Sequence, residues 1–133
     1  ATVYDQQGKS QEAIQKLEET KILAPNDIGL AFQLGVVYYQ KKDFDKAQGE
    51  FERAKILDPS YANARYMLGL VYDKKGARQR AIEEFLKVSE SNPSNEEVKK
   101  ILANLSAGNP ALAGIVPEQP PIQETPKEIQ KKK

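Results

Sequence analysis

Paired carboxylates and serine hydroxyls are the side chains of this sequence that could take part in catalysis, since the chain has no histidine and no cysteine. The carboxylates form adjacent pairs at Glu18–Glu19 and Glu83–Glu84. They lie along the outer faces of predicted helices, where such pairs are usually solvated. The serines have no histidine to act as a general base. The sequence therefore predicts no catalytic residues and no enzyme.

Metal and nucleotide binding are not predicted either. Thiolates and imidazoles, which most often bind transition metals, are absent. The sequence contains neither a GxxxxGK[ST] loop for phosphates nor a GxGxxG fingerprint for dinucleotides. We therefore expect no cofactor and no metal.

The balance of charges bears on partners and on location. Twenty basic and nineteen acidic residues give a formal net charge of +1, so no strong field attracts nucleic acid, and no nucleic-acid partner is predicted. No apolar run approaches the roughly 20 residues needed to cross a bilayer, so we expect no membrane insertion within this chain. The cytoplasm is the default localisation. The chain looks like a fragment, and a targeting or membrane segment could lie outside it.

The most informative pattern is a repeat with a period of 34 residues. Aligning residues 28–61 with residues 62–95 without a gap gives ten identities, namely Leu34/Leu68, Gly35/Gly69, Val37/Val71, Tyr38/Tyr72, Lys41/Lys75, Ala47/Ala81, Glu50/Glu84, Phe51/Phe85, Pro59/Pro93 and Ser60/Ser94. Part of an earlier copy is found at Tyr4, Ala13, Leu17 and Pro25.

Each copy is predicted to form two amphipathic helices, because its apolar residues recur three or four positions apart. The turn between the paired helices needs one residue with left-handed backbone, which Gly8 and Gly76 can supply. Lys42 holds this position in the middle copy. A left-handed Lys42 would carry a strain of roughly 1 kcal/mol.

The repeated residues resemble the tetratricopeptide repeat. The matching positions are Leu34, Gly35, Tyr38, Ala47, Phe51, Ala54 and Pro59, and then Leu68, Gly69, Tyr72, Ala81, Phe85 and Pro93. The tryptophan typical of the first helix is replaced by Ala31 and Arg65, and the small residue late in the second helix is Val88 in the last copy. The resemblance implies an all-α fold, a short right-handed α-solenoid of helix-turn-helix repeats with a C-terminal capping helix and a proline-rich tail.

The predicted organisation has five parts. These are a partial first repeat at 1–27, with the end of helix A plus helix B, full repeats at 28–61 and 62–95, a capping helix at 96–106, and a proline-rich extended tail or linker at 107–133. The predicted structural core comprises Leu34, Gly35, Tyr38, Ala47, Phe51, Leu68, Gly69, Tyr72, Ala81 and Phe85.

In the family that the chain resembles, the first helices of successive repeats line a concave groove that receives an extended peptide or a partner helix. The corresponding residues here are Phe32, Val36, Tyr39, Tyr66, Leu70 and Asp73, with Lys100 and Asn104 on the closing helix. We expect packing within each repeat to leave them free. The resemblance thus implies a non-catalytic scaffold that binds a protein or peptide partner of unknown identity within a larger assembly.

Several alternatives remain open. The groove residues could pack against neighbouring inner helices, or cover the chain's own tail or another copy of the chain. Self-assembly into a homo-oligomer is the main rival function, through the uncapped end of the helical array, which exposes apolar surface, or through the chain's own tail. An RNA-binding helical repeat is a remote alternative, since the predicted groove is not basic.

One subtype of the family is not expected. Chaperone-tail adaptors clamp a terminal carboxylate with Lys and Asn at groove positions that here hold Phe32, Val36, Tyr66 and Leu70. Lys100 and Asn104 do not rebuild that clamp. In the tail, Pro117 to Pro120 forms a minimal P-x-x-P, for which a stiff spacer is the expected role.

Overall fold

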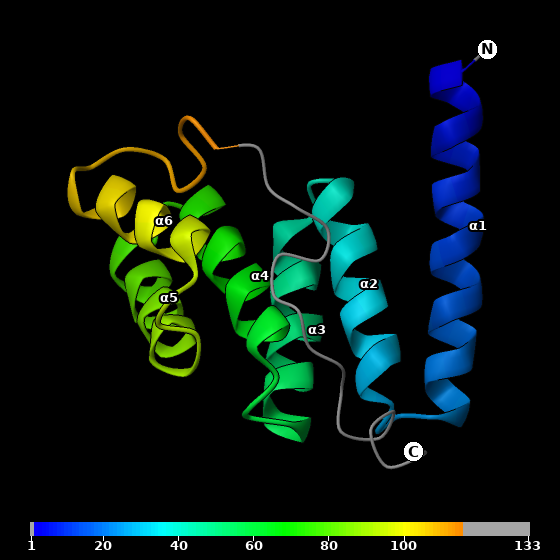
Figure 1. Ribbon diagram of the computed structural model, residues 1–133. Coiled ribbons are helices and arrows are strands. Elements are labelled where there is room, and N and C mark those ends of the chain that lie inside the picture. Colours follow the sequence, from blue (N-terminus) through cyan, green and yellow to red (C-terminus); the bar gives the residue numbers. More distant parts are fainter. Residues whose placement is uncertain (1, 116–133) are drawn as a thin grey trace.

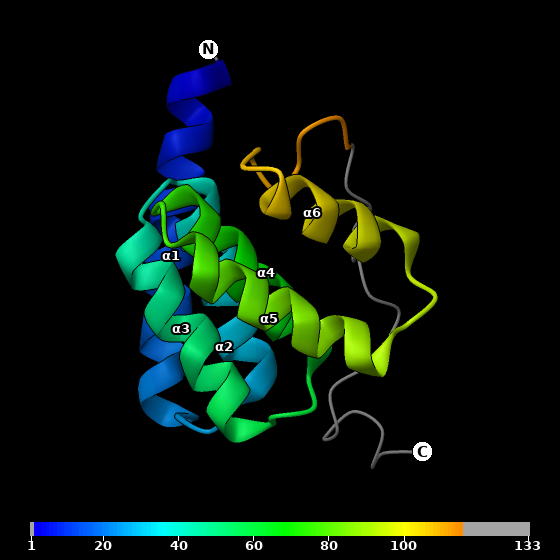
Figure 2. The same ribbon diagram turned by 90° about the vertical axis from the view of Figure 1, so that its left-hand side faces the viewer.

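The computed structural model describes residues 2–115, and their side chains from residue 11 onward. Within that range the chain forms six α-helices and no strand, and the predicted all-α fold is confirmed. The helices are α1 (Thr2–Leu23), α2 (Ile28–Gln40), α3 (Phe44–Leu57), α4 (Ala62–Lys74), α5 (Arg78–Ser91) and α6 (Glu96–Ser106). Each packs against the next in sequence, so that they follow one another across the molecule from α1 to α6 (Figures 1 and 2).

Helices α2 and α3 form one antiparallel hairpin, and α4 and α5 form the next (Figure 1). The residues predicted as core are all buried in these four helices. The two phenylalanines, Phe51 and Phe85, are fully buried. Helix α6 closes the array by burying Val98 and Ile101 against the same apolar cluster. None of the helices within residues 2–115 combines the length and the apolar character that crossing a membrane requires.

The paired helices approach closely because a glycine on one faces a phenylalanine on the other. A Cβ atom placed on Gly35 would lie 2.5 Å from Cε1 of Phe51, and one on Gly69 would lie 2.5 Å from Cε2 of Phe85. No real Cβ tolerates such a contact, so the ring occupies the space that a side chain would fill. This arrangement explains why glycine recurs at this position in both hairpins.

The turns at the ends of α2, α4 and α6 share one hydrogen-bond pattern. In the first, the N–H of Lys42 donates to the carbonyl of Tyr39 and that of Asp43 donates to Tyr38. This Schellman motif needs left-handed backbone at its penultimate residue. Gly76 and Gly108 supply it with φ of 80° and 84°, and Lys42 adopts it with φ of 64°. The left-handed Lys42 expected from the repeat alignment is therefore present.

Two sequence expectations differ from the structure. Gly8 does not form a turn, because α1 continues through it from Thr2 to Leu23. The continuous helix satisfies the backbone hydrogen bonds on both sides of Gly8 within one element. Residues 107–115, expected to be part of an extended tail, instead fold into turns in which Ala111 is buried. The remainder of that predicted tail, with Pro117 to Pro120, lies outside the described residues.

We predict that Gly35→Ala lowers the free energy of unfolding by about 1 to 3 kcal/mol, since the new methyl group overlaps the Phe51 ring. Gly49→Ala is the matched control, because Gly49 lies within α3 with no atom within 4 Å of an added Cβ. That control should raise stability by roughly 0.5 to 1 kcal/mol through helix propensity. Urea denaturation measures both. Equal effects of the two substitutions would contradict the proposed ring-on-glycine contact.

We also predict that Lys42→Gly raises the free energy of unfolding by roughly 0.5 to 1 kcal/mol, since it removes the left-handed strain of a side-chain-bearing residue. Lys41→Gly, one position earlier at φ of −84°, should not stabilise. Thermal unfolding of the two variants beside the parent chain provides the comparison. Stabilisation by Lys41→Gly alone would show that the strain does not reside at Lys42.

Candidate functional site

The first predicted groove face lies on α2. Phe32, Val36 and Tyr39 are half-buried and pack at the margin of the main apolar cluster. The Phe32 ring meets the Phe51 ring edge-on at 5.6 Å between centroids. The Tyr39 ring meets the Phe44 ring in the same manner at 5.5 Å. This face therefore keeps part of its apolar surface exposed while the rest supports the hairpin.

The corresponding face of α4 is not free. Tyr66 and Leu70 are only 1% and 5% exposed, so the expectation that packing leaves them accessible is wrong. The Tyr66 ring meets Phe85 edge-on at 5.4 Å, and its hydroxyl donates a hydrogen bond to Glu97 of α6. Burial, reinforced by that hydrogen bond, raises the pKa of Tyr66. Sequence spacing along α4 could not reveal the contacts of Tyr66, because they come from Phe85 of α5 and Glu97 of α6.

The remaining predicted groove residues flank α4 and α6. Asp73 and Asn104 are half-buried, whereas Lys100 is exposed. The Asp73 carboxylate accepts a hydrogen bond from the backbone N–H of Ala111 at 3.2 Å. The Asn104 side-chain amide donates to the carbonyl oxygens of Ala111 at 3.0 Å and of Ala113 at 2.9 Å. We call residues 109–115 the return segment, because they fold back onto α4 and α6.

Two open hollows lie along this region. The first, of about 410 Å³, is lined by Tyr39, Gln40, Lys42, Phe44 and Lys74. The second, of about 370 Å³, is lined by Asp73, Lys74, Gly76, Arg78, Gly108, Asn109 and Pro110. Lys74 belongs to both, so the aromatic hollow beside α2 adjoins the polar hollow beside the return segment. The aromatic hollow is also lined by two lysines, and the pKa of its Tyr39 is raised first by burial and then by the Asp73 charge.

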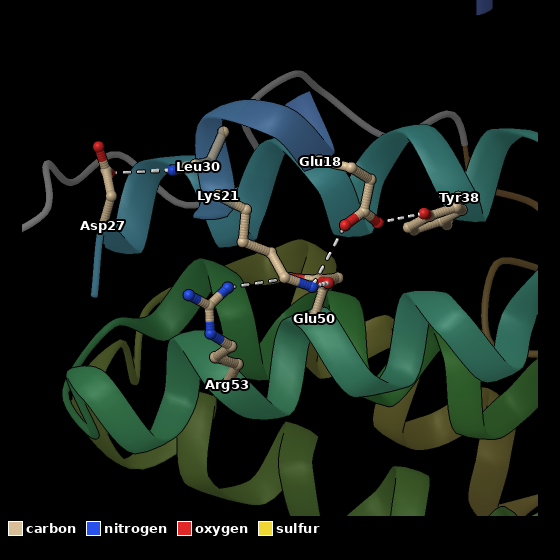
Figure 3. Close-up of polar contacts among 7 residues, drawn as sticks. All are labelled: Glu18, Lys21, Asp27, Leu30, Tyr38, Glu50 and Arg53. Carbon is tan, nitrogen blue, oxygen red and sulfur yellow. Dashed lines mark hydrogen bonds and ion pairs between the residues drawn. The ribbon is translucent and has the colours of Figure 1, made fainter. Parts of the chain in front are cut away.

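Polar contacts that repeat with the same period join one hairpin to the next. The Lys21 ammonium lies 2.7 Å from the Glu50 carboxylate, and Lys55 lies 2.9 Å from Glu84. The hydroxyl of Tyr38 likewise donates to Glu18. Figure 3 shows Lys21 between Glu18 and Glu50, with Arg53 on the far side of Glu50. We call these contacts the inter-repeat ladder.

The second step of the ladder involves Tyr72, whose hydroxyl donates to Glu52 at 3.0 Å, and burial together with that bond raises its pKa to about 12. The ladder then ends. Leu86 and Ser89 of α5 stand where Glu52 and Lys55 stand in α3. Helix α6 is attached instead through buried Val98, Ile101 and Leu105 and through the Tyr66–Glu97 hydrogen bond.

The sequence analysis did not predict the inter-repeat ladder, because it took the charged residues to lie on solvated helix faces. Glu50 and Glu84 appeared among the identities, but their cations at Lys21 and Lys55 were not connected to them. The sequence did contain a signal for these pairs, since the lysine precedes its glutamate by the same 29 residues in both copies. A search for opposite charges that recur at a fixed offset would have found them.

Comparison with known proteins now identifies the array. The family model of the tetratricopeptide repeat matches residues 32–96. Residues 32–96 therefore belong to the tetratricopeptide-repeat family. The "First TPR of Spaghetti (RPAP3) bound to HSP90 peptide SRMEEVD" is a similar structure, with 26% identity and a TM-score of 0.72, covering 79% of this chain and 83% of that one. MamA is another, with 28% identity and a TM-score of 0.72, covering 79% of this chain and 61% of that one.

The chain therefore spans about three fifths of the MamA structure it matches. A comparison with curated proteins gave no match. Tetratricopeptide-repeat domains generally serve protein–protein interaction and are typically non-catalytic binding modules, and RPAP3 binds a peptide.

We predict that Glu18 makes the stability of the tetratricopeptide-repeat array sensitive to acid. The hydrogen bond from Tyr38 is the main cause that lowers the pKa of Glu18 below 4.5, with Lys21 adding to it. A carboxyl with a lower pKa in the folded state stabilises above its unfolded pKa and loses that contribution as the pH falls through the folded pKa. The advantage of the parent chain over Glu18→Gln in thermal midpoint should therefore shrink between about pH 6 and about pH 3.

Glu19→Gln is the control for this prediction, since Glu19 is exposed and accepts a hydrogen bond from Gln15 on its own helix. Its thermal midpoint should follow that of the parent chain over the whole pH range. Calorimetric scans of the three chains at several pH values provide the measurement. If the advantage over Glu18→Gln stays constant on acidification, Glu18 is not the coupled group.

Proposed function

We propose that this tetratricopeptide-repeat domain is a non-catalytic scaffold that binds an extended peptide or a partner helix along the α2 face. The observation that carries the proposal is the partly exposed apolar line of Phe32, Val36 and Tyr39, which ends in the aromatic hollow beside Phe44. A continuous apolar strip of this kind on a rigid helix is suited to peptide side chains. The membership of the family supports the same function.

The chemistry of the hollow suggests the type of partner. Its lining combines Tyr39 and Phe44, which pack edge-on, with Lys42 and Lys74. An apolar anchor side chain would fill the hollow, and a carboxylate next to it would meet the lysines. The preferred peptide therefore combines an aliphatic or aromatic residue with a neighbouring acidic residue.

The peptide bound by RPAP3, SRMEEVD, is a useful comparison. The positions at which chaperone-tail adaptors clamp a terminal carboxylate hold Phe32, Val36, Tyr66 and Leu70 here. Two of these four, Tyr66 and Leu70, are also buried. We therefore propose that this chain selects internal apolar sequences and binds SRMEEVD weakly, and that it works within a larger assembly.

Self-assembly is the second candidate, and the outer end of α1 favours it. Ile22 and Leu23 are 79% and 86% exposed, and Ile56, one period later on α3, is 76% exposed. Exposed large apolar side chains of this kind are suited to contact with another copy. Light scattering across a concentration series distinguishes the two functions, because a constant monomer mass of about 15 kDa contradicts self-assembly.

To test peptide binding, the full chain would be used to select from a displayed library of random peptides, with SRMEEVD as a reference. We expect enriched peptides to bind Val36→Ser on the order of tenfold more weakly than the parent, because the substitution removes apolar contact within the strip. Ile56→Ser is the matched control, a β-branched aliphatic to serine change on α3, and should bind as the parent does. Circular dichroism would verify that both variants fold.

No enrichment of any peptide would contradict the proposed function. Equal loss of binding in Val36→Ser and Ile56→Ser would also contradict it, because the α2 face would then not be the site. Tighter binding of SRMEEVD than of the selected peptides would show that the partner is an acidic tail.

A further inference from the structure

We propose that the return segment is an intramolecular occupant of the groove, which a partner must displace in order to reach the α4–α6 end. The inference rests on the proposed function, since it specifies how the same groove is regulated. Three observations on residues 109–115 support it: the kind of hydrogen bonds that hold them, the place of those bonds in the repeat, and the small apolar area that they bury.

The hydrogen bonds hold the main chain of the segment. Asp73 accepts from the N–H of Ala111, while the Asn104 amide donates to the carbonyls of Ala111 and Ala113. Two side chains thus bind three backbone groups of one short turn. Because backbone groups are common to all peptides, the same side chains can bind another chain that adopts this turn.

The two side chains occupy groove positions of the repeat. Asn104 follows Leu70 by 34 residues, as Leu70 follows Val36. Asp73 lies one turn beyond Leu70, at the position that Tyr39 takes on α2. The return segment is therefore bound by side chains of the groove line, at its α4–α6 end.

The segment buries little apolar surface of its own. Ala111 is fully buried, but its side chain is a single methyl group, and Leu112 and Ile115 are only partly buried. Helix α6, by contrast, buries Val98, Ile101 and Leu105. The difference implies that the segment can leave while α6 stays in place. Gly108, with φ of 84°, is the point at which the chain turns away from α6.

The hollow beside the segment gives a partner access to it. It is lined by Asp73 and Arg78 on one side and by Asn109 and Pro110 on the other. A peptide seated in the aromatic hollow reaches this second hollow at Lys74. If it continues toward α6, it competes with the return segment for Asp73 and Asn104, and its apparent affinity is reduced by the fraction of chains in which the segment is bound.

The test uses the full chain and a blocked synthetic peptide with the sequence of residues 107–115, AGNPALAGI. The peptide is titrated to millimolar concentration, and binding is followed by the backbone amide NMR signal of Asp73, a residue that contacts the segment and is present in every variant. Ala111→Glu should release the segment, since a carboxylate replaces a buried methyl group. We expect that variant to bind the peptide on the order of tenfold more tightly than the parent chain. Ala113→Glu, at an exposed position, should bind it as the parent does.

A second opening variant, Leu112→Asp, guards against misfolding of the first, and adding Asn104→Ala to either should abolish the gain in binding. If neither opening variant binds the peptide more tightly than the parent, the segment is a fixed part of the fold and the proposal is wrong. A doubled mass in light scattering, with the segment exchanged between two copies, would also overturn the intramolecular form. Peptides selected on the parent chain that remain sensitive to Val36→Ser would show that the scaffold function survives such a failure.

Discussion

The contact between a phenylalanine ring and a glycine backbone sets the geometry of the array. Phe51 lies on Gly35 and Phe85 on Gly69, at distances that leave no room for a side chain on the glycine. Because the ring fixes how closely the two helices of a hairpin approach, it also fixes the direction in which α2 and α4 face the groove. The partly exposed strip on α2 and the burial of Tyr66 on α4 both follow from the placement of these helices.

The ring contact acts within a hairpin, whereas the inter-repeat ladder acts between neighbouring units. Lys21 and Glu50 join α1 to α3, and Tyr38 joins α2 to Glu18 of α1. The buried Glu50 has cations on two sides, Lys21 and Arg53, so its charge is compensated as a buried carboxylate requires. Partially exposed pairs of this kind add modest stability, but their geometry favours one register between units.

The sequence could predict those features that depend on one repeat at a time. The identities gave the hairpins and the buried residues, and the alignment of Lys42 with Gly76 predicted its left-handed backbone. Features that depend on what surrounds a repeat were not predictable in this way. Tyr66 donates its hydrogen bond to Glu97 of α6, α1 continues through Gly8, and the return segment is held by Asp73 and Asn104 from two different helices. Composition alone marked residues 107–115 as linker, because their few small apolar side chains give no periodic pattern.

The end of the ladder at α5 has a consequence for how arrays of this type can grow. Leu86 and Ser89 replace the glutamate and lysine that α3 offers to the next hairpin. A duplicated copy of residues 28–61 inserted directly before residue 62 would find complementary charges at both of its borders. The same copy appended after α5 would face Leu86 and Ser89 in place of a glutamate and a lysine. It would also displace α6 from the apolar surface on which it packs. Gene duplication can therefore lengthen this array by inserting repeats before the α4–α5 hairpin, which keeps its place next to α6.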